Sequence, residues 1–396
     1  MLGLIGYHPR VINNVELRNK MNEKTVVVVF PSLFSLNKIG YLVSSISKIL
    51  KTKNLGFSKI RKNGYVIIVE ANDPVFASSA INSLFGIEKV AIAREIENSF
   101  NAIVSAITTV GTNLLLKGER FYVKVDGIGT EYVPKDVELA ATSALIEKMV
   151  DLQTKPGTEL NHDKIIYTHL TKSHAYVCIF IDKGGGGIPY KSQNEKILCC
   201  IYDELSAVSC IQTLKTGFDV KILVCYSNES ELLNIVKMIN QILPRLVQTK
   251  VELHFCKLNM KSSRRSILLK TAIITEILVS FAKRVRIDRI SLAISPLIFP
   301  TWFVEYNAMR VFQKDVIPWF PLSGIDNSIF DTVKELGLEK HVSKIEHLCK
   351  TKFKRGLPQD KINKISQVSL RSIKTVIIEL GSKNIHDIID SLKSNH

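Results

Sequence analysis

Apolar and polar positions alternate along the chain in a way that predicts strands and helices from residue 24 onward. "KTVVVVFP" (24–31) and "YVIIVEA" (65–71) are β-branched runs typical of strands, and residues 35–50 between them have helical spacing. "VFASSAINSLFGIEKVAIA" (75–93) predicts a helix followed by a strand, and Gly86 stands where a helix C-terminus favours a left-handed residue. This β, α, β, α, β order predicts a small α+β sandwich.

A second unit is predicted to begin inside that last helix. Its elements are a helix over 98–115, the strand "RFYVKVDG" (120–127), a helix from Pro134 to Met149, and strands over 164–171 and 174–182. The stretch "KGGGGIPYKSQN" (183–194) follows, with four glycines and a proline. Such a composition predicts either a linker or a backbone that approaches another segment closely.

From Lys196 to about Arg355 the pattern changes to near-continuous apolar strands separated by helices. The expected strands cover 196–202, 219–226, 250–258, 289–295 and 316–322, and the expected helices include one ending at Gly217, 229–243 and 262–284. Strands that are apolar on both faces indicate a parallel sheet covered by helices on both sides. A ligand is expected at the carboxyl ends of these strands.

The composition indicates a folded, multidomain protein with a polyanionic partner. The chain has 396 residues, 46% apolar content, a net charge of +16 and a pI near 9.4. Residues 344–374 hold nine basic and two acidic residues, and Lys257, Lys261, Arg264, Arg265 and Lys270 form a run without an acid. Such clustering favours a nucleic-acid surface, although lysines that only improve solubility are the simpler explanation.

The cysteines indicate reduced, buried thiols and therefore a cytoplasmic protein. There are seven, most of them inside apolar runs, with no CxxC pair and no zinc-like spacing of Cys and His. We therefore expect no disulfide framework and no metal. Pro9 and Arg10 interrupt the N-terminal apolar stretch, and the run 266–282 contains polar and charged residues. No membrane association is expected.

Several short stretches, in this order, resemble the tRNA 4-thiouridine sulfurtransferase family. They are "LFGIEKV", "GERFYVKVDG" with "KDVELAATSALIEKM", "KGGGGIPY", "SGIDNSIFDTVKELGL" and "EHLCKTKFKRGLP". The resemblance runs from about residue 24 to about residue 358. It implies a multidomain α/β protein. The implied parts are a ferredoxin-like domain (1–76), a THUMP domain (77–183), a Gly-rich linker (184–194), a PP-loop pyrophosphatase-like α/β domain related to the adenine nucleotide alpha hydrolases (195–358) and a basic C-terminal tail (359–396).

The family's phosphate-binding PP-loop, S-G-G-x-D-S, would fall directly after the first strand of the third domain. The residues that align with this motif are Cys199, Cys200, Ile201, Tyr202, Asp203 and Glu204. Neither glycine and neither serine of the motif is present, so backbone N–H groups lack the usual means to close around a phosphate. Asp203 and Glu204 add negative charge, and the simpler interpretation is that they cap the following helix, from Leu205.

Two further positions depart from the family pattern, and one agrees with it. Asp326 is followed by Asn327 where the resemblance implies a lysine, and "ISPLIFPTW" (294–302) replaces a glycine-rich stretch. Cys349 stands where the family carries its sulfur-transferring cysteine, with His347, Lys350 and Lys352 beside it. An ordinary thiol in a basic loop is the alternative.

Basic residues around the predicted THUMP domain and the C-terminal segment are candidates for RNA contacts. They are Lys117, Arg120, Lys124, Lys135, Lys172, Lys183, Lys191, Lys352, Lys354 and Arg355. Each is equally explained as a solvated surface residue. This pattern favours recognition of RNA shape and backbone rather than of bases.

Three hypotheses follow for the function. The first is a tRNA-binding protein of tRNA modification in which ATP-dependent activity is lost or reduced, with tRNA as partner and no cofactor. The second is an active ATP-dependent tRNA sulfurtransferase that acts through Cys349 and Asp203 with a sulfur-donor protein. The third is a protein-interaction scaffold without RNA, which an exposed apolar patch would favour. The resemblance also implies a homodimer. The second hypothesis gains if Arg264, Arg265 or Lys270 reaches the carboxyl end of the first strand, whereas the first predicts that they face outward.

Overall fold

The computed structural model describes most of the chain as an α/β protein with two sheets. The described residues are 24–129, 131–260, 267–324, 327–343, 347, 350–351, 353, 355–380 and 388. They form two compact units. The first contains Phe57–Ser78, Ala91–Asp182 and the described residues up to Val29, and the second contains Phe30–Gly56, Ser79–Val90 and the described residues from Lys183 onward. The predicted α/β multidomain fold is confirmed, and the domain boundaries at 76, 183, 194 and 358 stay predictions.

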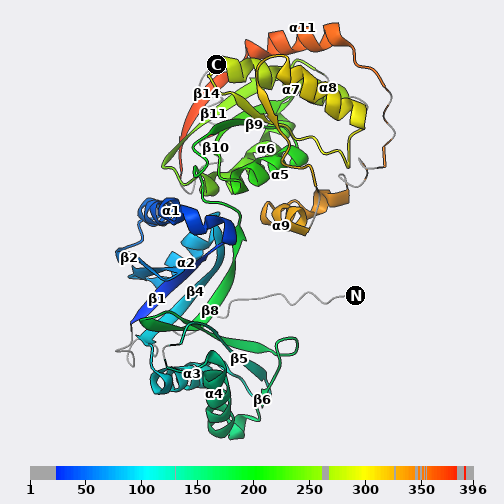
Figure 1. Ribbon diagram of the computed structural model, residues 1–396. Coiled ribbons are helices and arrows are strands. Elements are labelled where there is room, and N and C mark those ends of the chain that lie inside the picture. The colour runs from blue at the N-terminus through cyan, green and yellow to red at the C-terminus, as the bar shows by residue number, and fades with distance from the viewer. Residues whose placement is uncertain are drawn as a thin grey trace. The chain divides into compact units, whose positions relative to one another are not determined.

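An eight-stranded sheet contains the strands of the first half of the chain, in the order β2-β3-β1-β4-β8-β7-β5-β6 (Figure 1). The strands are β1 (Thr25–Pro31), β2 (Phe57–Asn63), β3 (Val66–Ala71), β4 (Ile87–Glu97), β5 (Arg120–Gly127), β6 (Lys155–Pro156), β7 (Lys164–Leu170) and β8 (His174–Gly186). The helices are η1 (Leu33–Lys38), α1 (Ile39–Thr52), α2 (Pro74–Asn82), α3 (Phe100–Leu114), α4 (Pro134–Lys148) and η2 (Val150–Leu152). The apolar pattern predicted β5 and the start of α4 at the residues where they occur.

A six-stranded sheet forms the centre of the second half of the chain, in the order β13-β12-β9-β10-β11-β14. The strands are β9 (Lys196–Ile201), β10 (Asp219–Tyr226), β11 (Lys250–Lys257), β12 (Arg289–Ser291), β13 (Ile317–Trp319) and β14 (Lys374–Glu379). The five strands β9 to β13 are mutually parallel, as predicted, and β14 pairs antiparallel with β11. The expected strand 289–295 ends at Ser291, after which Leu292 N–H bonds to the Trp319 carbonyl at 2.8 Å.

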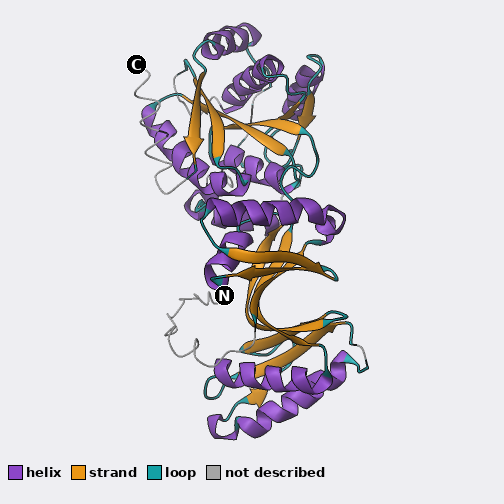
Figure 2. Ribbon diagram, turned by 90° about the vertical axis from the view of Figure 1, so that its left-hand side faces the viewer, coloured by secondary structure: helices purple, strands orange, loops and turns teal. Residues whose placement is uncertain are grey.

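Helices cover both faces of this sheet (Figure 2). They are α5 (Glu204–Lys215), α6 (Glu229–Ile242), η3 (Leu243–Leu246), α7 (Ile267–Arg284), α8 (Thr301–Phe312), α9 (Asn327–Glu335), η5 (Glu339–His341) and α11 (Gln359–Leu370). Five of the six residues of β9 are buried, as expected for a strand covered on both sides. Among the described helices, none is long and apolar enough to cross a membrane.

The glycine-rich stretch after residue 182 is a closely packed backbone segment. β8 continues through Gly186, and a Cβ atom on Gly184 would lie 2.3 Å from the Ile87 carbonyl oxygen. Gly187 has a φ of +72°, and a Cβ there would lie 2.5 Å from the Lys215 carbonyl oxygen. Ser32 Oγ donates to the Gly187 carbonyl at 2.6 Å, and Lys38 Nζ donates to the Ser192 carbonyl at 3.2 Å. Of the two explanations for these glycines, close approach is the one that the structure shows.

Candidate functional site

The topology of the six-stranded sheet points to a ligand site between β9 and β12. The chain runs from β9 to β10 and β11 on one side, and then returns to place β12 and β13 on the other. In doubly wound folds, ligands bind outside the carboxyl ends of the strands where the strand order reverses in this way. The β9–α5 turn, where the resemblance predicts the altered PP-loop, lies at this reversal.

Asp203 and Ser206 cap the start of α5 through reciprocal hydrogen bonds. Asp203 Oδ1 accepts a hydrogen bond from the Ser206 N–H at 2.8 Å. Ser206 Oγ accepts from the N–H groups of Tyr202 at 2.8 Å and Asp203 at 2.9 Å, and it donates to the Asp203 carbonyl at 2.8 Å. This arrangement is a reciprocal capping box. The prediction that Asp203 caps the helix is confirmed, with Glu204 rather than Leu205 as the first helical residue.

The capping arrangement uses the donors that a phosphate would need. A PP-loop binds phosphate through the free N–H groups at the start of its helix. Here three of these N–H groups already bind oxygen atoms of Asp203 and Ser206. Burial raises the pKa of the Asp203 carboxyl, and its hydrogen bonds with Ser206 and the charge of Lys270 oppose that shift.

A small cavity lies at the reversal point. The cavity there has a volume of about 10 Å³ and is lined by Cys200, Tyr202, Thr271 and residues 291–294. Such a volume holds about one water molecule, whereas ligand pockets measure roughly 300–1,000 Å³. Tyr202 is only 6% exposed, and burial raises the pKa of its hydroxyl well above the usual value. The residues present therefore do not fit an adenine nucleotide at this position.

Lys270 lies at the same end of the sheet and does not face outward. Its Nζ lies 3.4 Å from Glu231 Oε2 and 6.0 Å from the centre of the Tyr202 ring. The side chain is 19% exposed. The expectation that Lys270 faces outward is therefore wrong, because Glu231 and the Tyr202 ring hold the ammonium group inward. Arg264 and Arg265 lie outside the described residues.

Other predicted site residues can be placed only in part. Cys199, Cys200 and Ile201 lie within β9 and are buried. Glu204 Oε1 lies 3.2 Å from His341 Nδ1. Asn327 begins α9, while Cys349, Lys352 and Lys354 lie outside the described residues. In the part of the chain that the structure describes, no group of three or more His, Cys, Asp and Glu residues could hold a metal ion.

Comparison with known proteins gives similar proteins by sequence and by fold. No family model matches the chain. A curated protein of Methanosarcina mazei named probable tRNA sulfurtransferase is 24% identical over 227 residues, which are 55% of each chain. The structure is similar to a crystal structure of a 4-thiouridine synthetase–RNA complex with bound ATP, with a TM-score of 0.62, 13% identity and coverage of 90% of this chain and 100% of the other.

The chain is similar in sequence to curated tRNA sulfurtransferases and similar in fold to a 4-thiouridine synthetase. It spans about half the length of the curated relatives that it matches. The fold is also that of the crystal structure of PH1313 from Pyrococcus horikoshii, with a TM-score of 0.61, 18% identity and coverage of 79% of this chain and 100% of the other. The predicted resemblance to the tRNA sulfurtransferase family is thereby confirmed.

Ser206 takes part in the β9–α5 turn but was not among the residues predicted from the sequence. Its hydroxyl completes the capping box and is 0% exposed. The available signal was the spacing of Asp203 and Ser206, because an N-cap acid with a polar residue three positions later is typical of a self-capped helix start.

The predicted RNA-contacting residues are divided between the two units. Lys117, Arg120, Lys124, Lys135 and Lys172 belong to the first unit, and Lys183, Lys191 and Arg355 belong to the second. Several of them pair with acids. The pairs are Arg120 with Asp163 (3.5 Å), Lys124 with Glu159 (3.1 Å), Lys135 with Glu138 (2.7 Å), Lys183 with Asp331 (3.5 Å) and Lys191 with Asp219 (3.2 Å). Most of these pairs are exposed, so an RNA phosphate can compete with the acid for the cation.

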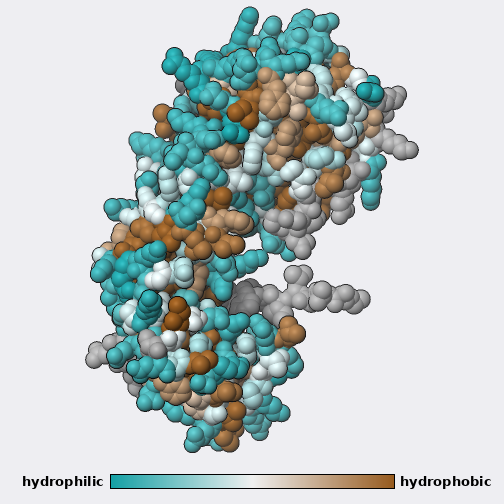
Figure 3. Space-filling model, in the orientation of Figure 1, coloured by the Kyte–Doolittle hydropathy of each residue, from teal (hydrophilic) through white to brown (hydrophobic). Residues whose placement is uncertain are grey.

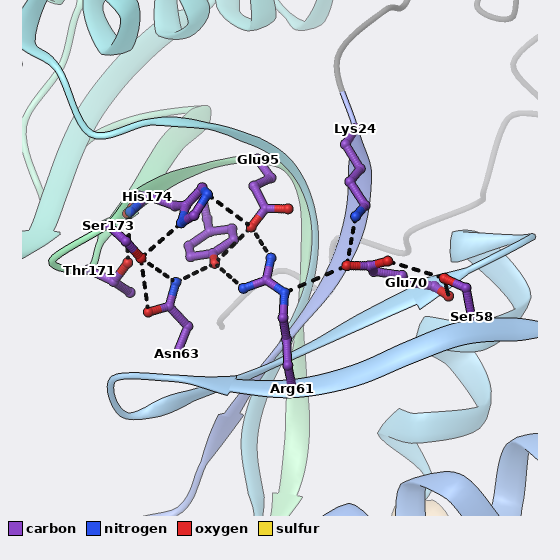
Figure 4. Close-up of polar contacts among 10 residues, drawn as sticks. Lys24, Ser58, Arg61, Asn63, Glu70, Glu95, Thr171, Ser173 and His174 are labelled. Atoms are coloured by element: carbon purple, nitrogen blue, oxygen red, sulfur yellow. Dashed lines mark hydrogen bonds and ion pairs between the residues drawn. The ribbon is translucent and has the colours of Figure 1, made fainter.

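A polar cluster ties the β2–β3 hairpin to β4 and to the β7–β8 turn within the first unit. Arg61 lies between Glu95 and Glu70, and Lys24 Nζ lies 2.7 Å from Glu70 (Figure 4). Tyr176, on β8, donates from its hydroxyl to Glu95 at 3.1 Å. Burial alone would lower the pKa of Arg61, but its bonds to Glu95 and Tyr176 raise it. These contacts hold the strands of the predicted ferredoxin-like and THUMP segments in one continuous sheet.

An apolar surface on η1 bears on the scaffold hypothesis. Leu33 is 74% exposed and Phe34 is 67% exposed, and Leu36 and Tyr41 are partly exposed beside them in sequence. Apolar residues gather in this part of the surface in Figure 3. Exposed patches of this kind mark interaction sites more often than isolated apolar residues do.

Proposed function

We propose that this protein binds tRNA and assists tRNA modification, with ATP-dependent activity lost or reduced. The observation that carries this proposal is the self-capped start of α5. Asp203 and Ser206 occupy three N–H groups that a PP-loop would offer to phosphate. The named relatives support tRNA as the partner, because one of them is a 4-thiouridine synthetase in complex with RNA.

The charge of the chain supports the same partner. A net charge of +16 favours binding to a polyanion, because each neutralised phosphate releases counterions. Exposed pairs such as Lys183 with Asp331 contribute little to folding, so their lysines remain available to RNA. The proposal also places the protein in the cytoplasm, and the six described cysteines are all free thiols, which agrees with a reducing compartment.

An active ATP-dependent sulfurtransferase acting through Cys349 is the second candidate. One observation favours it, since Lys270 reaches the carboxyl end of β9. For Lys270 to serve a phosphate, it would have to leave Glu231, and the Asp203 cap would have to open. A sulfur-donor protein belongs to this candidate, and a homodimer is compatible with either candidate.

Titration of the full chain with tRNA and with Mg-ATP, at about 50 mM and 200 mM salt, distinguishes the candidates. The proposal predicts tRNA binding that weakens by about tenfold or more at the higher salt, and no saturable ATP binding. A duplex DNA of equal charge serves as the control for unspecific attraction. Equal affinity for the DNA, or salt-independent tRNA binding, contradicts tRNA recognition. Saturable ATP binding that Lys270→Met abolishes favours the second candidate.

A further inference from the structure

A second cavity lies at the carboxyl ends of β10 and β11, on the other side of β10 from the reversal point. Its volume is about 470 Å³, and its lining includes Ser227, Lys257, Asn259, Met260, Val368 and Ser372. This volume falls in the range of small-molecule sites, in contrast to the cavity of about 10 Å³ beside Tyr202. Carboxyl ends of parallel strands are the usual place for ligands in such folds.

One lining side chain has a buried polar atom without a partner. Ser227 Oγ is buried and makes no hydrogen bond to any residue that the structure describes, whereas the Ser227 N–H donates to Glu231 Oε2 at 2.9 Å. Buried hydroxyls nearly always have partners, because an unsatisfied one destabilises the folded chain. Ser227 follows the last residue of β10, so its free hydroxyl belongs to the carboxyl edge where a ligand would bind.

A cation at the end of β11 is also free of ion pairs among the described residues. Lys221 and Lys250, on the same two strands, lie 3.9 Å from Glu252 and 2.6 Å from Glu379. Lys257 has no such partner in the described part of the chain. Glu231, which accepts a hydrogen bond from the Ser227 N–H, already pairs with Lys270. The cavity therefore carries a net positive charge.

The remaining lining is apolar or offers hydrogen bonds. Met260 and Val368 supply apolar walls, and Val368 is 45% exposed although it lies on a packed helix. Asn259 provides an amide, and Ser372 Oγ donates to the Lys257 carbonyl at 3.2 Å. A lysine and hydroxyls beside apolar walls fit an anionic head joined to a flat or apolar body.

We propose that this cavity binds a phosphate monoester that carries an apolar or aromatic group, of the size of a mononucleotide. Lys257 and Ser227 bind the phosphate, and Met260 and Val368 contact the body of the ligand. Free mononucleotides and the 5′-phosphorylated end of an RNA both have this chemistry. The proposal is independent of tRNA binding and of the site at the β9–α5 turn.

Calorimetric titration of the full chain with UMP, uridine, inorganic phosphate and a 5′-phosphorylated trinucleotide tests the proposal. We expect saturable UMP binding that uridine does not reproduce, and weaker binding of inorganic phosphate. Lys257→Gln should weaken UMP binding by about tenfold and Ser227→Ala by about fivefold. The matched control Lys221→Gln should leave the affinity unchanged. Tighter binding of the trinucleotide than of UMP identifies an RNA end as the ligand, and the reverse identifies a free nucleotide.

The thermal stability of the ligand-free variants gives an independent reading. Ser227→Ala should leave the melting temperature unchanged or raise it, because it removes an unsatisfied buried hydroxyl. A variant that is folded but binds UMP less tightly then reports on the site and not on misfolding. The proposal is wrong if UMP does not bind saturably, if both substitutions leave the affinity unchanged, or if only Lys270→Met abolishes binding.

Discussion

Asp203 and Ser206 each hold the backbone of the other at the start of α5. Asp203 Oδ1 accepts from Ser206 N–H at 2.8 Å, and Ser206 Oγ accepts from Asp203 N–H at 2.9 Å. Side chains of the protein therefore stand where a PP-loop would leave donors for phosphate. The glycines that would let the backbone open around a phosphate are absent, and a buried tyrosine, Tyr202, lies before the cap.

Replacing Ser206 should destabilise the fold. Ser206→Ala leaves the N–H groups of Tyr202 and Asp203 without their acceptor in a buried position. We expect the free energy of unfolding to fall by about 1–3 kcal/mol. Denaturant unfolding measures the loss, with the exposed helical Ser44→Ala as a control expected within about 0.5 kcal/mol of the parent. A Ser206→Ala protein as stable as the control would show that this cap contributes nothing to the free energy of unfolding.

The charge of Asp203 should make stability depend on pH. Burial raises the pKa of the Asp203 carboxyl above its ordinary value of 3.8, so the folded chain holds the proton more tightly than the unfolded chain does. The stability that the protonated Asp203 carboxyl contributes is therefore fully present below the ordinary pKa. It is lost as the pH rises through the pKa of the folded state.

Asp203→Asn keeps a good cap without the charge, so its stability should not decline in this way as the pH rises above about 4. Asp203→Ala should be less stable than Asp203→Asn by about 1 kcal/mol at neutral pH. Unfolding curves for the parent and both variants at several pH values measure these differences. Parallel pH profiles for the parent and Asp203→Asn would contradict the buried carboxylate.

Lys270 and Glu231 should be energetically coupled. Their charged atoms lie 3.4 Å apart, and both side chains are less than a quarter exposed. A double-mutant cycle with Lys270→Met and Glu231→Gln should give a coupling of about 0.5–3 kcal/mol in the free energy of unfolding. Additive effects would mean that Lys270 is free to serve a ligand instead.

The glycines after residue 182 should tolerate no side chain. Gly184→Ala and Gly187→Ala each place a Cβ within 2.5 Å of a carbonyl oxygen, and Gly187 also has a positive φ. We expect each variant to lose more than about 1 kcal/mol of stability. Gly40→Ala is the matched control, because Gly40 has open space around it in α1, where alanine favours the helix by about 1 kcal/mol. Equal stability of all three variants would indicate a loose linker.

The sequence predicted most elements because their apolar patterns are regular. β5 and α6 occur where the periodicity placed them, within a residue or so. β2 was missed, because "FSKIRKN" is largely polar and gains its strand structure from pairing with β3. The antiparallel pairing of β14 with β11 was also not predicted, since strand order and direction depend on contacts distant in sequence.

The candidate site was predicted less completely than the fold. The missing glycines and the acids at 203 and 204 were visible in the sequence, and they pointed to the turn after β9. The inward position of Lys270 was not predictable, because Glu231 and Tyr202 come from other elements. The orphaned hydroxyl of Ser227 likewise depends on packing and has no sequence signature.

Mg-ATP binding to the full-length protein in the presence of saturating tRNA tests the central claim most directly. Because the donors at the start of α5 are occupied by Asp203 and Ser206, the account predicts no saturable heat of ATP binding. Saturable ATP binding that Lys270→Met abolishes and the matched Lys283→Met retains would contradict it, and would assign the turn after β9 to a working nucleotide site.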